Sequence, residues 1–178
     1  IRGSATYELI FQDCRIPGEN LLGQRGKGFP IAMNTIEGGR IGIAAQALGL
    51  AEGAIDETVK YTKERKQFGR SISQFQNTQF QLADMATKVA AAKGLVYAAV
   101  NAKQNKLPTL SVNAAQAKLF AAETAMDVTT KAVQLHGGYG YTREYPVERM
   151  MRDAKITEIY EGTSEVQRMV ISGALLRK

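Results

Sequence analysis

The sequence has very little of what disulfide frameworks and metal sites require. Cys14 is the only cysteine and His136 the only histidine among 178 residues. A single thiol has no partner within the chain, and one histidine with one cysteine falls short of a zinc ligand set. We therefore expect no disulfide framework, no metal site and a reducing compartment.

Long apolar runs and blocks of like charge are also missing. The sequence contains no stretch of 18 apolar residues, so we expect no membrane span. Its first residues lack the basic and apolar zones of a signal peptide and include no initiator Met, so we expect the chain to start inside a longer protein. The net charge is +6, but Lys and Arg are scattered among Asp and Glu. We interpret them as solvated helix faces, with a few arginines for phosphates of a small ligand, and expect no nucleic-acid partner.

Helical periodicity fills most of the chain. Apolar residues spaced by three, four or seven predict long helices over about 29–63, 75–105 and 110–136. Pro108 and the pair Gly137-Gly138 end the second and third helices. A short helix should follow Pro146, and a last one should run from about Ser164 to Leu176. Because three apolar stripes each need burial, the sequence predicts an all-α, antiparallel four-helix-bundle-like domain.

The N-terminal segment has a different pattern. Residues 5–11 alternate apolar and polar side chains, with Tyr7, Leu9 and Phe11 on one side, which predicts a β-strand. No second strand is evident in this chain, and an isolated strand or hairpin is marginal in water.

Two short motifs raise a choice between structure and chemistry. In the stretch "IYEGTSEVQR", Glu161 is either an acid at a helix start or a catalytic base, and Ser164 with Gln167 fits a capping box. In "EGGR", Gly38 and Gly39 interrupt a predicted helix, at about 1 kcal/mol each relative to alanine. They indicate either a kink with close helix packing or the close approach of a ligand, flanked by Glu37 and Arg40.

Two further segments, and His136 within the second of them, raise the same choice between structure and chemistry. "RKQFGR" offers Arg65 and Phe68 as contacts to a phosphate and a ring, but at an ordinary inter-helix turn. "QLHGGYGY" is interpreted as a helix C-cap. His136 continues an apolar stripe with Leu119, Ala122, Met126, Thr129 and Val133, so we interpret it as packing at a helix end.

Taken in order, "RKQFGR", "QLHGGYGYTREYPVERMMRDAKI" and "TEIYEGTSEVQR" resemble the C-terminal part of the acyl-CoA dehydrogenases, most closely the short-chain, butyryl-CoA type of anaerobic bacteria. The resemblance covers the whole chain. It implies that residues 1–24 are a remnant of the middle β-domain and that residues 25–178 form the C-terminal helical bundle. It also implies FAD as cofactor, a short-chain acyl-CoA substrate, a role in fatty acid metabolism and a bacterial cytoplasmic location.

The resemblance assigns roles to individual residues. Glu161 matches the base that removes the α-proton, while Glu37 remains a rival carboxylate. The residues implied at the acyl-CoA pocket are Glu37, Gly38, Gly39, Arg40 and Gly162. Those implied to contact FAD are Thr163, Ser164 and Glu165 at the flavin, Arg65, Phe68 and Gln76 toward a neighbouring subunit's FAD, and Gln134, Gly137 and Gly138 on its adenine side.

The implied partners are an electron-transfer flavoprotein and further copies of the chain in a homotetramer. An alternative stays open at this point, because the 178 residues on their own could be a catalytically inactive, self-associating helical bundle.

Overall fold

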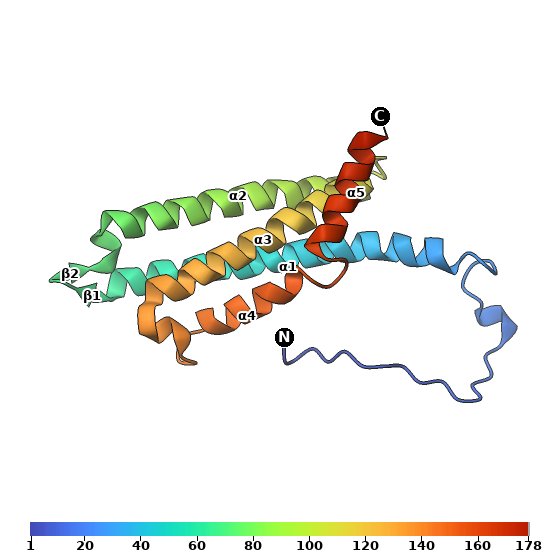
Figure 1. Cartoon of the computed structure of the whole chain (residues 1–178), viewed down its shortest axis with the longest axis horizontal. Coiled ribbons are helices and arrows are strands. Elements are labelled where there is room, and N and C mark those ends of the chain that lie inside the picture. The colour runs from blue at the N-terminus through green and yellow to red at the C-terminus, as the bar shows by residue number, and fades with distance from the viewer. Residues whose placement is uncertain (178) are drawn as a thin grey trace.

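The fold is that of an elongated helical bundle, seen in a computed structural model that describes residues 1–177 (Figure 1). Lys178, the last residue of the predicted bundle domain, lies outside the described residues. The helices are α1 (Gly28–Glu64), α2 (Gln76–Gln104), α3 (Leu110–His136), α4 (Val147–Thr157) and α5 (Ser164–Leu176). The bounds of α3 and α5 are those predicted from sequence, and those of α1 and α2 differ by one residue at each end.

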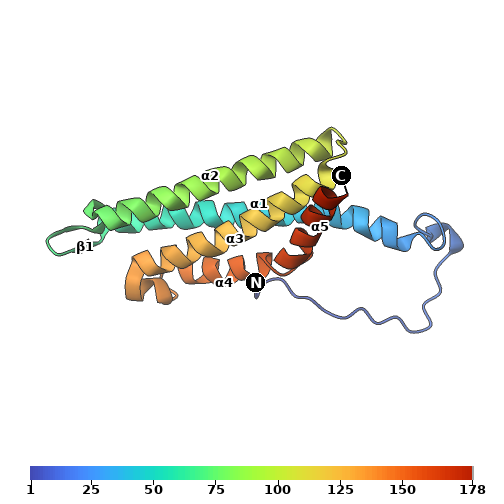
Figure 2. The same ribbon diagram turned by 45° about the horizontal axis from the view of Figure 1, so that its top comes forward.

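The helix α3 is the centre of the bundle. It packs against α1, α2, α4 and α5, while α4 also lies along α1 (Figures 1 and 2). The chain reverses direction between successive long helices, so α2 runs antiparallel to both α1 and α3. The predicted all-α bundle is therefore confirmed. In residues 1–177, no helix is both long enough and apolar enough to cross a bilayer.

Alanine forms much of the core. Ala47 and Ala51 of α1 belong to the same core cluster as Ala117, Ala121 and other alanines of α3, and all are fully buried. Alanine is the strongest helix former and its small side chain lets neighbouring helices approach closely. The apolar stripe that the sequence predicted to be the buried face of α3 was partly wrong, because it gave weight to the bulkier residues. Ala122, Thr129 and His136 are buried, but Leu119, Met126 and Val133 are only half-buried.

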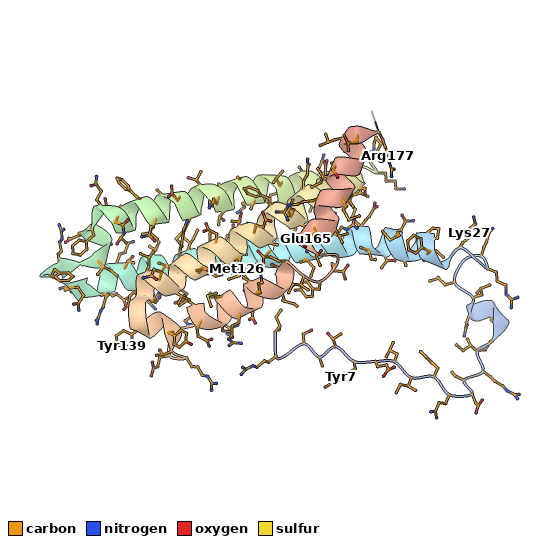
Figure 3. The ribbon with its side chains drawn as sticks, viewed as in Figure 1. Tyr7, Lys27, Met126, Tyr139, Glu165 and Arg177 are labelled. Atoms are coloured by element: carbon orange, nitrogen blue, oxygen red, sulfur yellow. The ribbon has the colours of Figure 1, made fainter. Side chains whose placement is uncertain are left out.

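The predicted strand at residues 5–11 is absent from the structure. The segment runs as an extended chain separate from the helices, as Figure 3 shows for Tyr7. Tyr7 is 84% exposed and Phe11 72%. The described residues offer it no neighbouring strand, so its backbone N–H and C=O groups have no ladder partners. At the start of this segment, the N-terminal amino group of Ile1 lies 3.8 Å from the carboxylate of Asp153 on α4.

The turn between α1 and α2 is a small hairpin. Strands β1 (Lys66–Gln67) and β2 (Arg70–Ser71) pair antiparallel around Phe68 and Gly69, whose φ angles are +52° and +78°. Two consecutive positive φ values are typical of a two-residue hairpin turn. The turn leaves the Phe68 side chain 92% exposed.

Candidate active site

The loop between α4 and α5 has an unusual backbone. Glu161 has a φ of +55° and Gly162 a φ of +86°. A residue with a β-carbon rarely adopts a positive φ, so the surroundings must hold Glu161 there. Tyr160 anchors one side of the loop, because its hydroxyl donates to Oε1 of Gln46 on α1 at 2.7 Å. On the other side, the N–H of Ser164 donates to the carbonyl of Glu158 at 2.9 Å.

The carboxylate of Glu161 lies against the backbone of α1 at Gly39. A β-carbon at Gly39 would lie only 2.7 Å from Cδ of Glu161 and closer still to Oε2. The glycine pair in α1 therefore marks a close approach, and the group that approaches Gly39 within this chain is the Glu161 side chain. Gly38 is different, since a β-carbon there would meet only the flexible end of Lys103, at 2.6 Å from Nζ.

Lys118 is a site residue that the sequence reasoning missed. Its side chain is fully buried in α3, and its Nζ donates to the carbonyl of Gly162 at 2.7 Å. Burial lowers the pKa of Lys118 to about 8, although the nearby Glu158 and Glu161 carboxylates oppose this shift. A lysine in a helix usually indicates a solvated face. The available signal was its register, four residues after Ala114 and three before Ala121 on the buried side of α3.

Arg40 brings a second buried cation to this region. The whole residue is only 3% exposed, and its Nε has no hydrogen-bond partner in the described residues. The positive charge of Arg40 is near enough to Lys118 to lower the pKa of that lysine further. Glu37, the rival carboxylate, is half-buried on α1 and makes no hydrogen bond or ion pair with residues 158–163 in the part of the chain that is described.

The cap of α5 corrects one prediction. Thr163, not Ser164, is the N-cap residue, and its Oγ1 accepts a 3.4 Å hydrogen bond from the N–H of Val166. The chain leaves Gly162 at positive φ, so Thr163 is the residue with the extended backbone that a cap needs. Ser164 is already helical and buried, and the Gln167 side chain turns back to the carbonyls of Glu161 and Gly162.

The predicted flavin-contacting residues of α5 share one hollow. Thr163, Ser164 and Glu165 line a depression of about 360 Å³ next to Arg168. Hydrogen bonds from its own backbone N–H and from the Thr163 hydroxyl lower the pKa of the Glu165 carboxyl. Figure 3 shows Glu165 near the middle of the bundle.

A second, larger cavity lies at the C-terminal end of α3, near Tyr139 in Figure 3. Its volume is about 550 Å³. Four of the predicted cofactor residues line it: Arg65, Gln134, Gly137 and Gly138. The guanidinium of Arg65 lies over the Tyr139 ring, 5.3 Å from its centroid. Phe68 and Gln76 do not line this cavity, and both side chains are exposed on the surface.

His136 forms part of the wall of this cavity. The predicted packing role at a helix end is confirmed, because the imidazole is buried and stacks on Tyr61 at a centroid distance of 4.2 Å. Its Nδ1 donates to the carbonyl of Ala132 at 2.7 Å, since a carbonyl can only accept. Burial lowers the pKa of His136, which favours the neutral ring. Nε2 is then an acceptor, and it has no partner in the described residues.

Comparison with known proteins identifies the family. The profile described as "Acyl-CoA dehydrogenase, C-terminal domain" matches residues 26–176. The chain belongs to the acyl-CoA dehydrogenase family. A curated relative from Clostridium acetobutylicum, "Acyl-CoA dehydrogenase, short-chain specific", is 65% identical over 177 residues, which is 99% of this chain and 46% of the relative.

Solved structures of relatives have the same fold. Butyryl-CoA dehydrogenase from Megasphaera elsdenii has a TM-score of 0.92 and 59% identity over 94% of this chain and 44% of its own. A chain solved in work on the electron transferring flavoprotein of Acidaminococcus fermentans has a TM-score of 0.93 and 63% identity, over 95% of this chain and 44% of its own. The chain thus spans about half the length of the relatives it matches.

The two groups of predicted cofactor residues in this acyl-CoA dehydrogenase domain are far apart. Glu123 of α3 lines the hollow at α5, and Gln134 lines the cavity at Arg65, 11 residues further along the same helix. At a rise of 1.5 Å per residue this is about 17 Å. The hollow at α5 and the cavity at Arg65 are therefore two separate sites on one chain.

The lowered pKa of His136 predicts a pH dependence of stability. The unfolded chain takes up a proton near pH 6.5, whereas the native state resists protonation until a lower pH. The free energy of unfolding should therefore fall as the pH drops from about 6.5 through the native pKa. Denaturant unfolding at about pH 7.5 and about pH 5 should show a larger loss for the wild type than for His136→Gln, which cannot titrate. Equal losses would show that His136 does not contribute.

Proposed function

We propose that this chain is the C-terminal domain of a flavin-dependent acyl-CoA dehydrogenase that introduces an α,β double bond into a short-chain acyl-CoA. One observation carries the proposal. The Glu161 carboxylate is held against the glycine backbone of α1 by a loop with positive φ angles, in a region with two buried cations, Arg40 and Lys118. The family membership and the short-chain relatives support the same reaction.

Glu161 is proposed to act as the base. It takes the α-proton of the thioester, and the electron pair of the broken C–H bond forms the new C=C bond as a hydride leaves the β-carbon. A carboxylate is a weak base toward carbon unless it is desolvated, and the apolar acyl chain supplies that cover when it binds. Glu161 is already half-buried before any substrate covers it.

The backbone around Glu161 suits the developing negative charge on the thioester oxygen. The N–H of Glu161 donates to no backbone carbonyl in residues 1–177, so it is available as a donor. Gly162 is a proposed substrate contact through its backbone, although a β-carbon there would meet Gln167 and Val166 of α5. Glu37, Gly38, Gly39 and Arg40 are the proposed contacts along α1.

The residues present fit FAD. When bound, FAD supplies the acceptor for the hydride. The hollow at Thr163, Ser164 and Glu165 offers hydroxyl groups and the N-terminus of α5 to polar atoms of a flavin. The distant cavity offers Arg65 for a phosphate, and the unpartnered Nε2 of His136 for a hydrogen-bond donor of the ligand.

We further propose that these two sites serve two different FAD molecules in a homo-oligomer. One chain's α5 contacts its own flavin, and its Arg65, Gln134, Gly137 and Gly138 contact the flavin of a neighbouring copy. Phe68 and Gln76, which project from the surface beside this cavity, are available to the same neighbour. We propose that this oligomer is a tetramer, as the resemblance to the family implies.

The electron acceptor is proposed to be an electron-transfer flavoprotein. The support is the similar chain solved in work on the electron transferring flavoprotein of Acidaminococcus fermentans. A cytoplasmic location belongs to the same proposal, because the similar curated relative is a bacterial enzyme.

The function is tested by assaying the full-length protein that contains this chain. It should retain FAD, reduce an artificial electron acceptor with butyryl-CoA, and release crotonyl-CoA. The 178-residue chain should give no turnover in the same assay, because the few flavin contacts in one chain must offset the entropy of immobilising a large cofactor. A full-length protein that binds FAD but leaves saturated acyl-CoA unchanged would contradict the proposal.

Arg65 tests the shared cofactor. In the full-length protein, Arg65→Ala should weaken FAD retention by roughly 1.5–3 kcal/mol, the contribution of a hydrogen bond to a charged group. The oligomer should dissociate more readily at the same time. Flavin content and native mass after dilution measure both effects. Arg70→Ala is the matched control, because Arg70 lies on the same hairpin but stacks on Phe75 at 4.1 Å, and it should leave both unchanged.

A further inference from the structure

Lys118 is a buried cation that the proposed reaction does not use directly. It has no exposed surface, and the hydrogen bond recorded for its Nζ is the one to the Gly162 carbonyl, at 2.7 Å. An ammonium group is expensive to bury unless a specific partner compensates for the lost water. The partner here is the backbone of the loop that carries the proposed base.

The carbonyls around Gly162 receive three hydrogen bonds from two side chains. Lys118 donates to the Gly162 carbonyl, and Nε2 of Gln167 donates to the same oxygen at 2.9 Å. The same Nε2 also donates to the Glu161 carbonyl at 3.2 Å. These bonds fix the two peptide groups that follow Glu161 and Gly162, which are the residues with positive φ.

The two donors come from different elements. Gln167 lies on α5, a few residues further along the chain from the loop, and would move with it. Lys118 lies on α3, the central helix of the bundle. Its hydrogen bond therefore ties the loop to the part of the fold that also positions α1 and Gly39.

The orientation of the Glu161 side chain depends on this tie. A positive φ is disfavoured for any residue with a β-carbon, so the loop without its tie would relax toward negative φ. Such a change would rotate the Cα–Cβ bond and move the carboxylate away from Gly39, which it now touches.

We infer that Lys118 is a positioning residue for the reaction, which holds the Glu161–Gly162 turn so that the base stays aimed at the α-carbon. The inference rests on the proposed function of Glu161. The neutral amine also donates hydrogen bonds, so positioning does not require Lys118 to be charged. The charged groups that act on it are Glu158, Glu161 and Glu165 from the α4–α5 region and Arg40 from α1.

The test uses Lys118→Ala and Lys118→Met in the full-length, FAD-loaded enzyme. Displacement of a reacting group by about 1 Å costs roughly 100-fold in rate, so kcat should fall by about that factor in both variants. KM for butyryl-CoA and flavin content should change little. The isotope effect of α-deuterated butyryl-CoA on kcat should rise, because proton transfer becomes more rate-limiting. Lys93→Met is the control, since Lys93 is an exposed lysine paired with Glu52, and it should keep full activity.

Chemical rescue separates positioning from a general structural role. Ethylamine should fit the space left in Lys118→Ala and donate to the Gly162 carbonyl. It should raise the kcat of this variant at least tenfold, which is roughly half of the expected 100-fold loss on a logarithmic scale. It should not restore Lys118→Met, whose side chain fills the space. Lys118→Met retains the unbranched length of lysine, so it is the variant expected to fold if the alanine variant does not.

Each outcome decides between the two proposals. Wild-type kcat in Lys118→Met overturns the positioning role. So does a loss of FAD or of folding in both variants, because Lys118 would then be a structural residue. If Glu161→Gln remains active, the proposed role of Glu161 as the base fails whatever Lys118 does, and the inference about Lys118 fails with it. If Glu161→Gln is inactive while Lys118→Met is unaffected, only the inference about Lys118 fails.

Discussion

Glu161→Gln in the full-length enzyme is expected to lower kcat by roughly two to four orders of magnitude, the contribution of a well-placed general base. Glutamine has the same shape as glutamate and retains hydrogen-bonding capacity, so the contact with Gly39 should survive. The amide cannot accept the α-proton. Steady-state turnover of butyryl-CoA measures the loss, and FAD content and acyl-CoA affinity should stay close to wild type.

Two other acids provide the matched controls for this variant. Glu37→Gln removes the rival carboxylate on α1, and Glu165→Gln removes the exposed acid in the first turn of α5. Neither should approach the loss seen at Glu161. If Glu37→Gln lost as much as expected for Glu161→Gln, while Glu161→Gln kept most of its activity, the base would have to be reassigned to Glu37.

Gly39→Ala is expected to cost about 100-fold in kcat without destabilising the protein. The added β-carbon would lie 2.7 Å from Cδ of Glu161, so the carboxylate must shift to make room. A shift of about 1 Å in a reacting group is enough for a loss of that size. The helix itself gains from the change, because alanine is better than glycine inside a helix by about 0.5–1 kcal/mol. Turnover and thermal unfolding, measured on the same sample, should therefore change in opposite directions.

Gly42→Ala on the same helix is the control for Gly39→Ala. A β-carbon at Gly42 would meet nothing within 4 Å. The substitution should give the same gain in helix stability with unchanged turnover. Equal kcat values for Gly39→Ala and Gly42→Ala would mean that the Glu161 carboxylate can leave Gly39 without consequence for the reaction.

The sequence predicted the helices well because they combine regular periodicity with strong stop signals. Pro108 and Gly137 end their helices where the sequence indicated, and Gly137 has the positive φ that glycine accepts readily. The strand at residues 5–11 failed for a physical reason. Alternation of side chains describes which faces a strand would present, but it does not supply the neighbouring strand that the backbone needs.

The site was predicted unevenly. The glycines of α1 indicated a close approach, but only the three-dimensional fold shows that Glu161 is the group that lies at Gly39. Lys118 was missed because a lysine in a helix usually indicates a solvated face, and only its register with Ala114 and Ala121 pointed to the buried side. Its burial follows from the arrangement of α3 among four other helices. The shift of the α5 cap from Ser164 to Thr163 depends on the positive φ of Gly162, which one-dimensional capping rules do not consider.

The central claim is that the Glu161 carboxylate removes the α-proton, and a single-turnover experiment tests it most directly. Full-length enzyme, wild type or Glu161→Gln, is mixed rapidly with saturating butyryl-CoA without an electron acceptor, and loss of the flavin's visible absorption is followed. The account predicts that the glutamine variant binds butyryl-CoA and bleaches roughly 100- to 10,000-fold more slowly than the wild type. Bleaching of the variant at the wild-type rate would contradict it.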